Sequence, residues 1–340
     1  MSLTTYILKR TVNLLITLFV FANFNFLMFE YIPMQYLGLG IQFFVPYRSP
    51  YQALHGDQYA QAVVHEFGLD QPWSVRYERY LVNIFTGNYG YCISAGCGHI
   101  SIWQTISQYA PNSIILLGVS TAVAVVLGVL VGVASSARRG KAFDLSSLSV
   151  SLFFFSVPVF WIGWILLYFL AVQNHLFPLA LGTATLGAGG IPIPADTAQY
   201  VQAYLWAAAL PILVLTLISY GGFALIMRNT MIDVLTEDYI FMARAKGVSE
   251  KNVLYKHALR NGLLPVVTDV ALAFGLILAG ATITESIFNF TGLGWELLHA
   301  AYALDYPVIQ GVFFIIAIVV VVANFLADLA YAFLDPRVRY

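Results

Sequence analysis

The chain has 340 residues, of which 60% are hydrophobic and only 10% are charged, whereas about 25% of the residues in an ordinary soluble domain are charged. The mean hydropathy is +0.78, and a net charge of −1 argues against a basic nucleic-acid-binding protein. The composition therefore excludes a typical soluble domain and indicates a membrane protein.

Six apolar runs are long enough to cross a bilayer, which takes about 20 helical residues. The run over 112–136 lacks the alternation of barrel strands, so we expect α-helices, which satisfy their own backbone hydrogen bonds. The sequence predicts an all-α polytopic membrane protein with six transmembrane helices, at 6–32, 112–135, 147–172, 204–227, 263–286 and 306–334.

The distribution of basic residues predicts the orientation of these helices. All but three of the 16 basic residues fall in the segments that share a side with the N-terminus, and the three exceptions are Arg48, Arg76 and Arg79. The positive-inside rule therefore predicts a cell-membrane protein with both termini in the cytoplasm. The first run resembles a signal peptide, but no small-residue cleavage site follows promptly, so we expect residues 1–32 to form the N-terminal tail and an uncleaved first span.

The segment over 33–111 is too long for a simple connection, and we expect an extracytoplasmic cap there, followed by a permease-like core over 112–340. Pro72 and Gly87 bracket a helical pattern, which matches the preference for proline at the start and glycine just past the end of a helix. A hairpin-like stretch follows over 89–97, where Gly96 offers a positive φ.

Both cysteines of the chain, Cys92 and Cys97, lie in this predicted cap. An extracytoplasmic location permits a disulfide between them, although their spacing does not establish the geometry that a disulfide requires. A metal site formed with His99 is the weaker alternative, because the spacing is irregular and no partner pair of ligands is present. We therefore predict no metal site.

The most highly charged segment covers 228–262. A helix is predicted from Glu237 to Lys246, with acidic residues in its first turn, basic residues in its last turn and Gly247 as its end. Ser249 is positioned to cap a second helix that runs to Arg260, with Gly262 and Pro265 closing that helix before the next span. The sequence thus predicts a helix-turn-helix on the cytoplasmic face.

The first helix of this loop is more apolar than a solvated connection needs. Its apolar residues are Tyr239, Ile240, Phe241, Met242, Ala243 and Ala245, and its alanines allow close approach of another backbone. One explanation is a helix that docks in a groove of a partner protein. The other is an amphipathic helix that lies on the lipid surface, and composition alone does not choose between them.

Several motifs resemble one family. The loop is similar to that of binding-protein-dependent ABC importer permeases, in particular the first-permease type of the dipeptide, oligopeptide and nickel branch, which implies a type I permease fold. The resemblance covers essentially the whole chain. It rests on the stretches over 237–240, 243–250, 257–261 and 264–265, and on those over 156–163, 284–288, 291–294, 305–307 and 335–340.

The resemblance implies that the first loop helix is a coupling helix, seated in a groove of a separate ATPase subunit. The family pattern has a glutamate at the start of its Glu-Ala-Ala motif, whereas this chain has Phe241-Met242-Ala243, a departure that looks like that of the peptide branch. The implied ATPase-coupling residues are Glu237, Asp238, Met242, Ala243, Arg244, Ala245, Lys246 and Gly247.

The implied function is that of a non-catalytic permease subunit of an ATP-driven importer of dipeptides or oligopeptides, with oligosaccharides or nickel as other cargoes of related systems. The chain has no phosphate-binding loop, so ATP and Mg belong to partner subunits. The implied partners are a homologous second permease, two ATPases, an extracytoplasmic solute-binding protein and the lipid bilayer. A stand-alone secondary carrier or channel is the main alternative, but we find no internal repeat of the kind many carriers show. An embedded enzyme is disfavoured because its common motifs are absent.

Polar residues within the spans are candidates for the translocation path, because polar groups in lipid are costly. Asn23 and Asn25 fit either a pathway or hydrogen bonds between helices. Ser156 precedes Pro158, which predicts a kink, and Asp269 completes the candidate set. Glu285 and Asp328 lie near span ends. Glu285 fits an outer gate or a contact with the binding protein, although we expect a solvated side chain, and Asp328 fits either the membrane interface or neighbouring basic groups.

Overall fold

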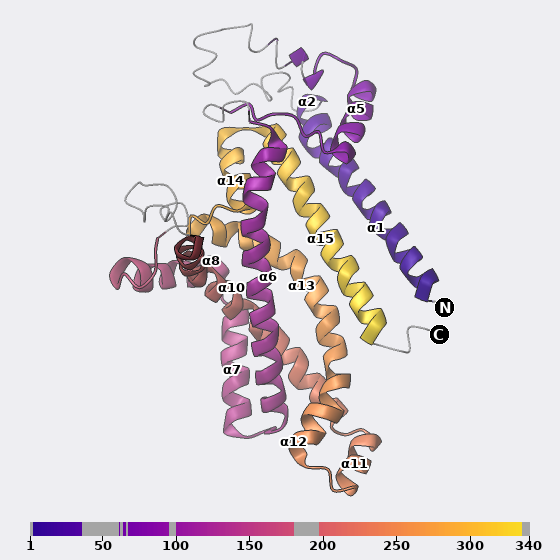
Figure 1. The fold of residues 1–340 in the computed structure, drawn as a ribbon, viewed down its shortest axis with the longest axis vertical. Helices are drawn as coiled ribbons and strands as arrows, with labels where there is room; N and C mark the ends of the chain where they lie inside the picture. Colours follow the sequence, from indigo (N-terminus) through magenta and orange to yellow (C-terminus); the bar gives the residue numbers. More distant parts are fainter. Residues whose placement is uncertain are drawn as a thin grey trace. The chain divides into compact units, whose positions relative to one another are not determined.

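The computed structural model describes residues 3–35, 61, 64–65, 67–94, 100–179 and 197–334. Within these ranges the regular structure is helical (Figure 1), apart from an antiparallel bridge between Tyr91 and Ser101. The elements are α1 (Leu3–Phe26), η1 (Leu27–Tyr31), α2 (Ile32–Gln35), α5 (Trp73–Thr86), α6 (Ile102–Ser136), α7 (Ala142–Ser156), α8 (Val159–Leu166), η3 (Leu167–Gln173), α10 (Thr197–Val234), α11 (Asp238–Ala245), α12 (Glu250–Asn252), η4 (Val253–Ala258), α13 (Leu259–Ile287), α14 (Leu293–Ala303) and α15 (Tyr306–Leu334).

Four helical segments are long and apolar enough to cross a membrane in the part of the chain that the structure describes. A fifth is added when the bent pair α7 and α8–η3 is taken as one span. Helix α13 covers the span predicted at 263–286, but the side chains at 268 and 271–280 lie outside the description. The four segments are Thr4–Met34, Ile102–Ser136, Ala198–Val234 and Tyr306–Leu326.

The span predicted at 147–172 is broken rather than continuous. Helix α7 ends at Ser156, Val157 and Pro158 are extended with ψ of 133° and 135°, and the two helical parts meet at 99°. A residue before proline is disfavoured in the α region, and proline has no N–H for the helix ladder. The predicted kink at Pro158 is therefore confirmed, and it is larger than a simple bend.

The largest differences at the start of a helix are those of α6 and α10. Helix α6 starts at Ile102 and runs through Pro111, whereas the predicted span began at residue 112. Helix α10 starts at Thr197, not at residue 204, and contains Pro211. A proline removes only one donor from the ladder, and in helices of 35 and 38 residues many other hydrogen bonds maintain the helix on both sides of it.

The chain divides into two compact units, of which unit 1 comprises Met1–Arg10, Ile114–Phe290 and Ala323–Tyr340. In this unit α7 returns alongside the end of α6 after a short turn (Figure 1). Gly128 and Gly132 of α6 face α10 so closely that a Cβ on Gly132 would lie 2.7 Å from the Cβ of Met227. This is the small-residue packing typical of membrane helices.

Unit 2 comprises Thr11–Ser113 and Thr291–Val322. Its α5 confirms the helix predicted between Pro72 and Gly87, because Pro72 precedes the first residue and Gly87 follows the last with φ of 79°. The hairpin-like stretch is held at Tyr91 by the bridge to Ser101, whereas Gly96 lies outside the described residues. Asp305 anchors this stretch, since its carboxylate accepts the N–H groups of Ile93 and Ser94 at 2.9 and 2.8 Å.

Candidate functional site

The predicted coupling helix is present as α11, Asp238–Ala245, and its ends agree with the sequence signals. Glu237 occupies the N-cap position, although its side chain makes no cap hydrogen bond. An acid lies in the first turn and Arg244 in the last, which is the favourable arrangement for the helix dipole. Gly247 follows with φ of 76°, the left-handed conformation that commonly ends a helix.

Helix α11 has one buried face and one exposed face. Ile240 is fully buried and Ala243 is 7% exposed, and both belong to a hydrophobic cluster formed with residues of α10, η4 and α13. Phe241 and Met242, by contrast, are 72% and 57% exposed. Apolar side chains of this size gain free energy when they are covered, so this face is suited to a partner protein or to lipid.

Three contacts connect α11 to the residues that follow it. Arg244 and Glu250 form an ion pair at 2.8 Å, and the Arg244 guanidinium holds the pKa of the Glu250 carboxyl below its usual range. Tyr239 accepts a hydrogen bond from the Asn261 side chain at 2.7 Å. The N–H of Val248 donates to the carbonyl of Ala243 at 3.3 Å. The helix is thereby fixed to the start of α13.

The second loop helix differs from the prediction. Ser249 lies at the N-cap of α12, but its side chain makes no cap hydrogen bond. The helical path continues through η4 into α13, so that Gly262 and Pro265 lie inside the helix and do not close it. A Cβ added at Gly262 would lie 3.0 Å from the sulfur of Met231. The absence of a side chain therefore lets the helix pack closely against Met231, and this packing keeps Gly262 in the helix. Packing thus overrides the helix-breaking propensity of glycine.

A polar network that the sequence did not predict precedes the loop. The Arg228 guanidinium donates two hydrogen bonds to the Asp144 carboxylate, at 2.6 and 2.8 Å. The same carboxylate accepts hydrogen bonds from the Ser135 hydroxyl and from the N–H of Gly140. Asp144 is 1% exposed. The sequence does show that Asp144 and Arg228 each lie beside an apolar run. Nothing in the hydrophobic pattern, however, indicates that two residues 84 positions apart form a pair.

Two of the translocation candidates, Asn23 and Asn25, lie in unit 2. The side-chain amide of each forms hydrogen bonds within the protein. The Asn23 amide donates to the carbonyl of Phe19 at 2.7 Å, and its oxygen accepts a bond from Tyr77. The buried Asn25 donates to the carbonyl of Gln310 at 3.0 Å. Hydrogen bonding between helices, one of the two expected roles, is therefore observed, and a pathway role stays a prediction.

The other candidates lie in unit 1. Ser156 and Pro158 are exposed at the break between α7 and α8, and Asp269 is partly buried in α13. Their place in a pathway stays a prediction as well.

Two further acidic residues have definite surroundings. Asp328 pairs with Arg10 at 2.9 Å, and its backbone carbonyl accepts a hydrogen bond from Tyr6, which confirms the expected basic neighbour. Glu285 is 1% exposed, so the expectation of a solvated side chain was wrong. The reason is that the chain turns directly after α13 and brings Phe288 and Phe290, both buried, back over the helix end.

The predicted disulfide falls partly outside the described residues. Cys92 is buried in unit 2, whereas Cys97 and His99 belong to the range 95–99, which is not described. A bridge between Cys92 and Cys97 stays a prediction.

Comparison with known proteins identifies the family. Residues 124–340 match the family described as binding-protein-dependent transport system inner membrane component. The chain is 35% identical to the oligopeptide transport system permease protein AppB of Bacillus subtilis, over 82% of this chain and 84% of the relative. It is 33% identical to the dipeptide transport system permease protein DppB of Escherichia coli K12, over 84% and 86% of the two chains. A di/tripeptide transport system permease protein of Pseudomonas aeruginosa is 34% identical over 82% and 84%.

The chain is a multi-pass membrane protein of the permease class. It belongs to the family of binding-protein-dependent transport system inner membrane components. Its role is that of the non-catalytic, membrane-embedded subunit of an ABC transporter.

Proposed function

We propose that the chain is one of two permease subunits of an importer for dipeptides or oligopeptides, driven by two separate ATPase subunits that bind ATP and Mg. An extracytoplasmic solute-binding protein delivers the cargo. The proposal is supported by the names of the relatives, which are dipeptide, di/tripeptide and oligopeptide transport permeases. Oligosaccharides and nickel become secondary candidates for the cargo.

The proposed topology has six spans with both termini in the cytoplasm and an extracytoplasmic cap over 33–111. It is supported by the positions of the basic residues and by the long apolar helices of the structure. In this orientation α11 and the residues of the 228–262 loop face the ATPase subunits, and α5 belongs to the cap.

The observation that carries the proposal is the division of α11 into two faces. Ile240 and Ala243 are packed into the cluster that joins α10, η4 and α13, while Phe241 and Met242 remain exposed beside them. A partner that grips the exposed face and moves will therefore displace α11 together with the helices behind it. Energetic coupling requires an element whose position is influenced by both partners, and α11 contacts the membrane helices on one face and the proposed ATPase on the other.

The full coupling set comprises residues on both faces of α11 and at its two ends. Gly247 sets the end of the helix, and the Arg244–Glu250 ion pair holds that end against the next element. Docking contacts are proposed for the exposed members of the set. They are Glu237, Asp238, Met242, Arg244, Ala245 and Lys246, together with Phe241.

A co-purification experiment with the cognate ATPase subunits tests the proposal. We expect Phe241→Asp and Met242→Asp to abolish association with the ATPase and peptide uptake, because a buried unpaired charge is costly at an interface. The matched control is Val82→Asp on α5, where an equally exposed apolar side chain (62%) is replaced on the cap. Membrane insertion should be unchanged in all three variants.

Retained association and uptake in the Phe241 and Met242 variants would contradict the coupling role of α11. Uptake by the purified chain alone, without any ATPase, would favour the secondary carrier or channel instead.

For the translocation path we keep Asn23, Asn25, Ser156, Pro158 and Asp269 as candidates. Ser156 and Pro158 have support because they lie at the broken span, where backbone groups leave the helical ladder; irregular backbone within a membrane occurs where it lines a cavity or is covered by protein. We also propose the bridge between Cys92 and Cys97, to which non-reducing mass spectrometry gives a direct answer.

A further inference from the structure

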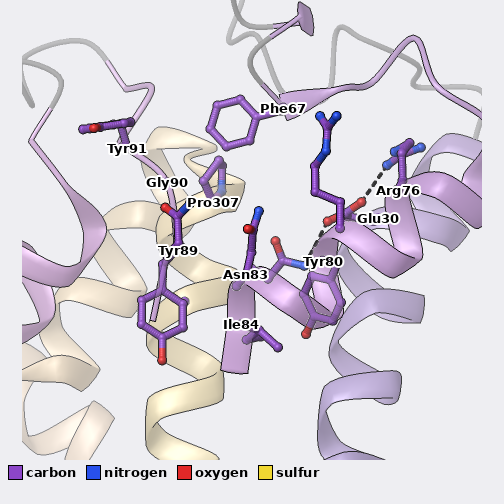
Figure 2. A pocket seen from close by; sticks show the side chains of 14 residues that line it. Glu30, Phe67, Arg76, Tyr80, Asn83, Ile84, Tyr89, Gly90, Tyr91 and Pro307 are labelled. Carbon is purple, nitrogen blue, oxygen red and sulfur yellow. Dashed lines mark hydrogen bonds and ion pairs between the residues drawn. The ribbon is translucent and has the colours of Figure 1, made fainter. Parts of the chain in front are cut away.

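Unit 2 contains a cavity of about 180 Å³ that the coupling function does not use. Its walls come from α5, the stretch over 88–91, the start of α15 and Glu30 near the end of the first helix. Figure 2 shows Glu30 and Arg76 on one side of this cavity, with Tyr89 and Tyr91 on the other. In the proposed topology the cavity lies on the extracytoplasmic side.

The deepest charged group of the cavity is Arg76. Its guanidinium pairs with Glu30 at 2.9 Å, and the two side chains are only 7% and 14% exposed. Glu30 also accepts a long hydrogen bond of 3.4 Å from Gln310. The Nε of Arg76 is buried without a hydrogen-bond partner in the described part of the chain. Buried polar groups almost always have partners, so this N–H lacks an acceptor.

A second cation lies at the same cavity. Arg79, one turn further along α5, lines it and is exposed, and its guanidinium lies against Gly68. Within the described ranges Arg79 has no ion-pair partner. Among the described residues that line the cavity, two arginines accompany one carboxylate, which corresponds to one excess positive charge. The amides of Asn83 and Asn88, which also line it, add neutral donors and acceptors.

We propose that this cavity binds the C-terminal carboxylate of a short peptide, an inference that rests on the proposed peptide-import function. Guanidinium groups match the geometry of a carboxylate. Arg76 and the exposed Arg79 both line the cavity, and their guanidinium groups supply donors for it. The rings of Phe67, Tyr89 and Tyr91 line the same cavity. The C-terminal residue of a peptide carries a carboxylate and a side chain on the same carbon. This combination fits a cavity in which arginines lie close to aromatic rings.

The size of the cavity limits what it can hold. Sites that enclose a whole ligand have volumes of about 300 to 1,000 Å³, and this cavity is smaller. It therefore takes the end of a peptide and leaves the remainder outside. An acidic side chain of the solute-binding protein is the competing occupant, and the experiment is designed to separate the two.

The test measures binding of the dipeptide Ala-Phe to the purified complex of both permeases and both ATPases, in lipid nanodiscs and without the solute-binding protein. The comparison ligand is Ala-Phe amide, which lacks the carboxylate. We expect the amide to bind at least about tenfold more weakly, because hydrogen bonds to charged groups contribute roughly that factor or more. Arg79→Gln should weaken Ala-Phe binding to a similar degree, and Arg79→Lys, which keeps the charge, should weaken it less.

The matched control is Glu78→Gln, a neighbouring exposed position of α5 that does not line the cavity. Its binding of Ala-Phe should equal that of the natural protein. Equal affinities for acid and amide, absence of Ala-Phe binding in the receptor-free complex, or an unchanged affinity in Arg79→Gln would each overturn the proposal. If Arg79→Gln leaves the affinity for Ala-Phe unchanged but abolishes docking of the solute-binding protein, the occupant of the cavity is an acidic side chain of that protein.

The same preparations separate this inference from the proposed function. Failure of the ATPase subunits to co-purify with the natural chain would contradict the proposed function. Normal co-purification with no carboxylate preference would contradict only the cavity assignment.

Discussion

Arg228 and Asp144 form a bidentate ion pair that joins the end of α10 to the beginning of α7. The carboxylate is completely enclosed and its remaining acceptor sites are used by Ser135 and Gly140. Arg228 lies ten residues before the start of α11, in the helix that leads into it. The pair therefore fixes α7 to α10, one of the helices against which α11 packs.

Removal of one partner of this pair should be strongly destabilising. Asp144→Asn leaves the Arg228 guanidinium without its counter-ion, and breaking a buried pair in this way costs about 3 to 5 kcal/mol, an upper bound here because Arg228 is 19% exposed. Thermal unfolding in detergent measures the loss. The exposed Arg244–Glu250 pair is the control, since Glu250→Gln should cost under about 1 kcal/mol.

A double replacement distinguishes lost charge pairing from lost packing. Asp144→Leu combined with Arg228→Met removes both charges, and it should recover most of the stability that Asp144→Asn loses. If the double variant were as unstable as the single one, the pair would not be the cause of the loss.

Substitution of Gly247 should destabilise the end of α11. The effect should be larger for residues that adopt a positive φ less readily. At φ of 76° a β-branched residue is strained, and we expect Gly247→Val to cost about 1 to 2 kcal/mol. Asparagine tolerates this conformation, so Gly247→Asn should cost less. An added Cβ would meet nothing within 4 Å, which makes the strain purely conformational.

Hydrogen exchange of the amides in 238–247 measures this local effect. The exchange should be about five- to thirtyfold faster in Gly247→Val than in the natural protein, following the same energy range. Equal exchange in the valine and asparagine variants would show that the backbone conformation at 247 does not control the loop.

Two glycines of α6 should respond in opposite directions to alanine. Gly132→Ala places a methyl group 2.7 Å from Met227 and 2.8 Å from the carbonyl of Ala224, and such overpacking costs about 1 to 3 kcal/mol. Gly118→Ala meets nothing within 4 Å and should stabilise the helix by about 0.5 to 1 kcal/mol. Thermal unfolding measures the change in stability of each variant. Destabilisation by Gly118→Ala would contradict the conclusion that this position has room for a methyl group.

Glu296 should make stability depend on pH. Burial is the main reason that its pKa lies above the ordinary value of 4.5, with His299 lowering it and Asp305 raising it. Between that value and the raised folded pKa, the folded state binds more protons than the unfolded state. Stability therefore falls as pH rises through this window and rises on acidification. In Glu296→Gln the dependence should be flatter in thermal unfolding scans taken from pH 4.5 upward. An identical pH profile would exclude Glu296 as its source.

The sequence was informative where a local pattern decides the structure. The ends of α11 and α5 follow from single residues, Gly247 and Gly87, whose conformation closes a helix whatever surrounds it. Proline also marks the break at Pro158, but Pro111 and Pro211 lie inside continuous helices, so the missing N–H alone does not decide where a helix breaks. The apolar runs located most of the long helices, because bilayer thickness sets their length.

The features that the sequence left open depend on contacts between distant residues. Pairing of Asp144 with Arg228 and burial of Glu285 arise only when separate helices meet, and neither leaves a periodic signal. Gly262 shows the same limit, since its propensity predicts a helix end and its packing against α10 keeps it inside α13. The cavity at Arg76 likewise requires the first and last long helices to be placed together with α5.

The ion pair between Arg10 and Asp328 has a consequence for biosynthesis. Unit 1 draws on residues near both ends of the chain, and Arg10 meets its acidic partner only after 318 further residues have been added. The ribosome must therefore translate as far as Asp328 before this unit can close. Until then Arg10, at the N-terminal end of the first helix, lacks this counter-ion, and insertion factors or membrane quality control can act on the chain at this stage.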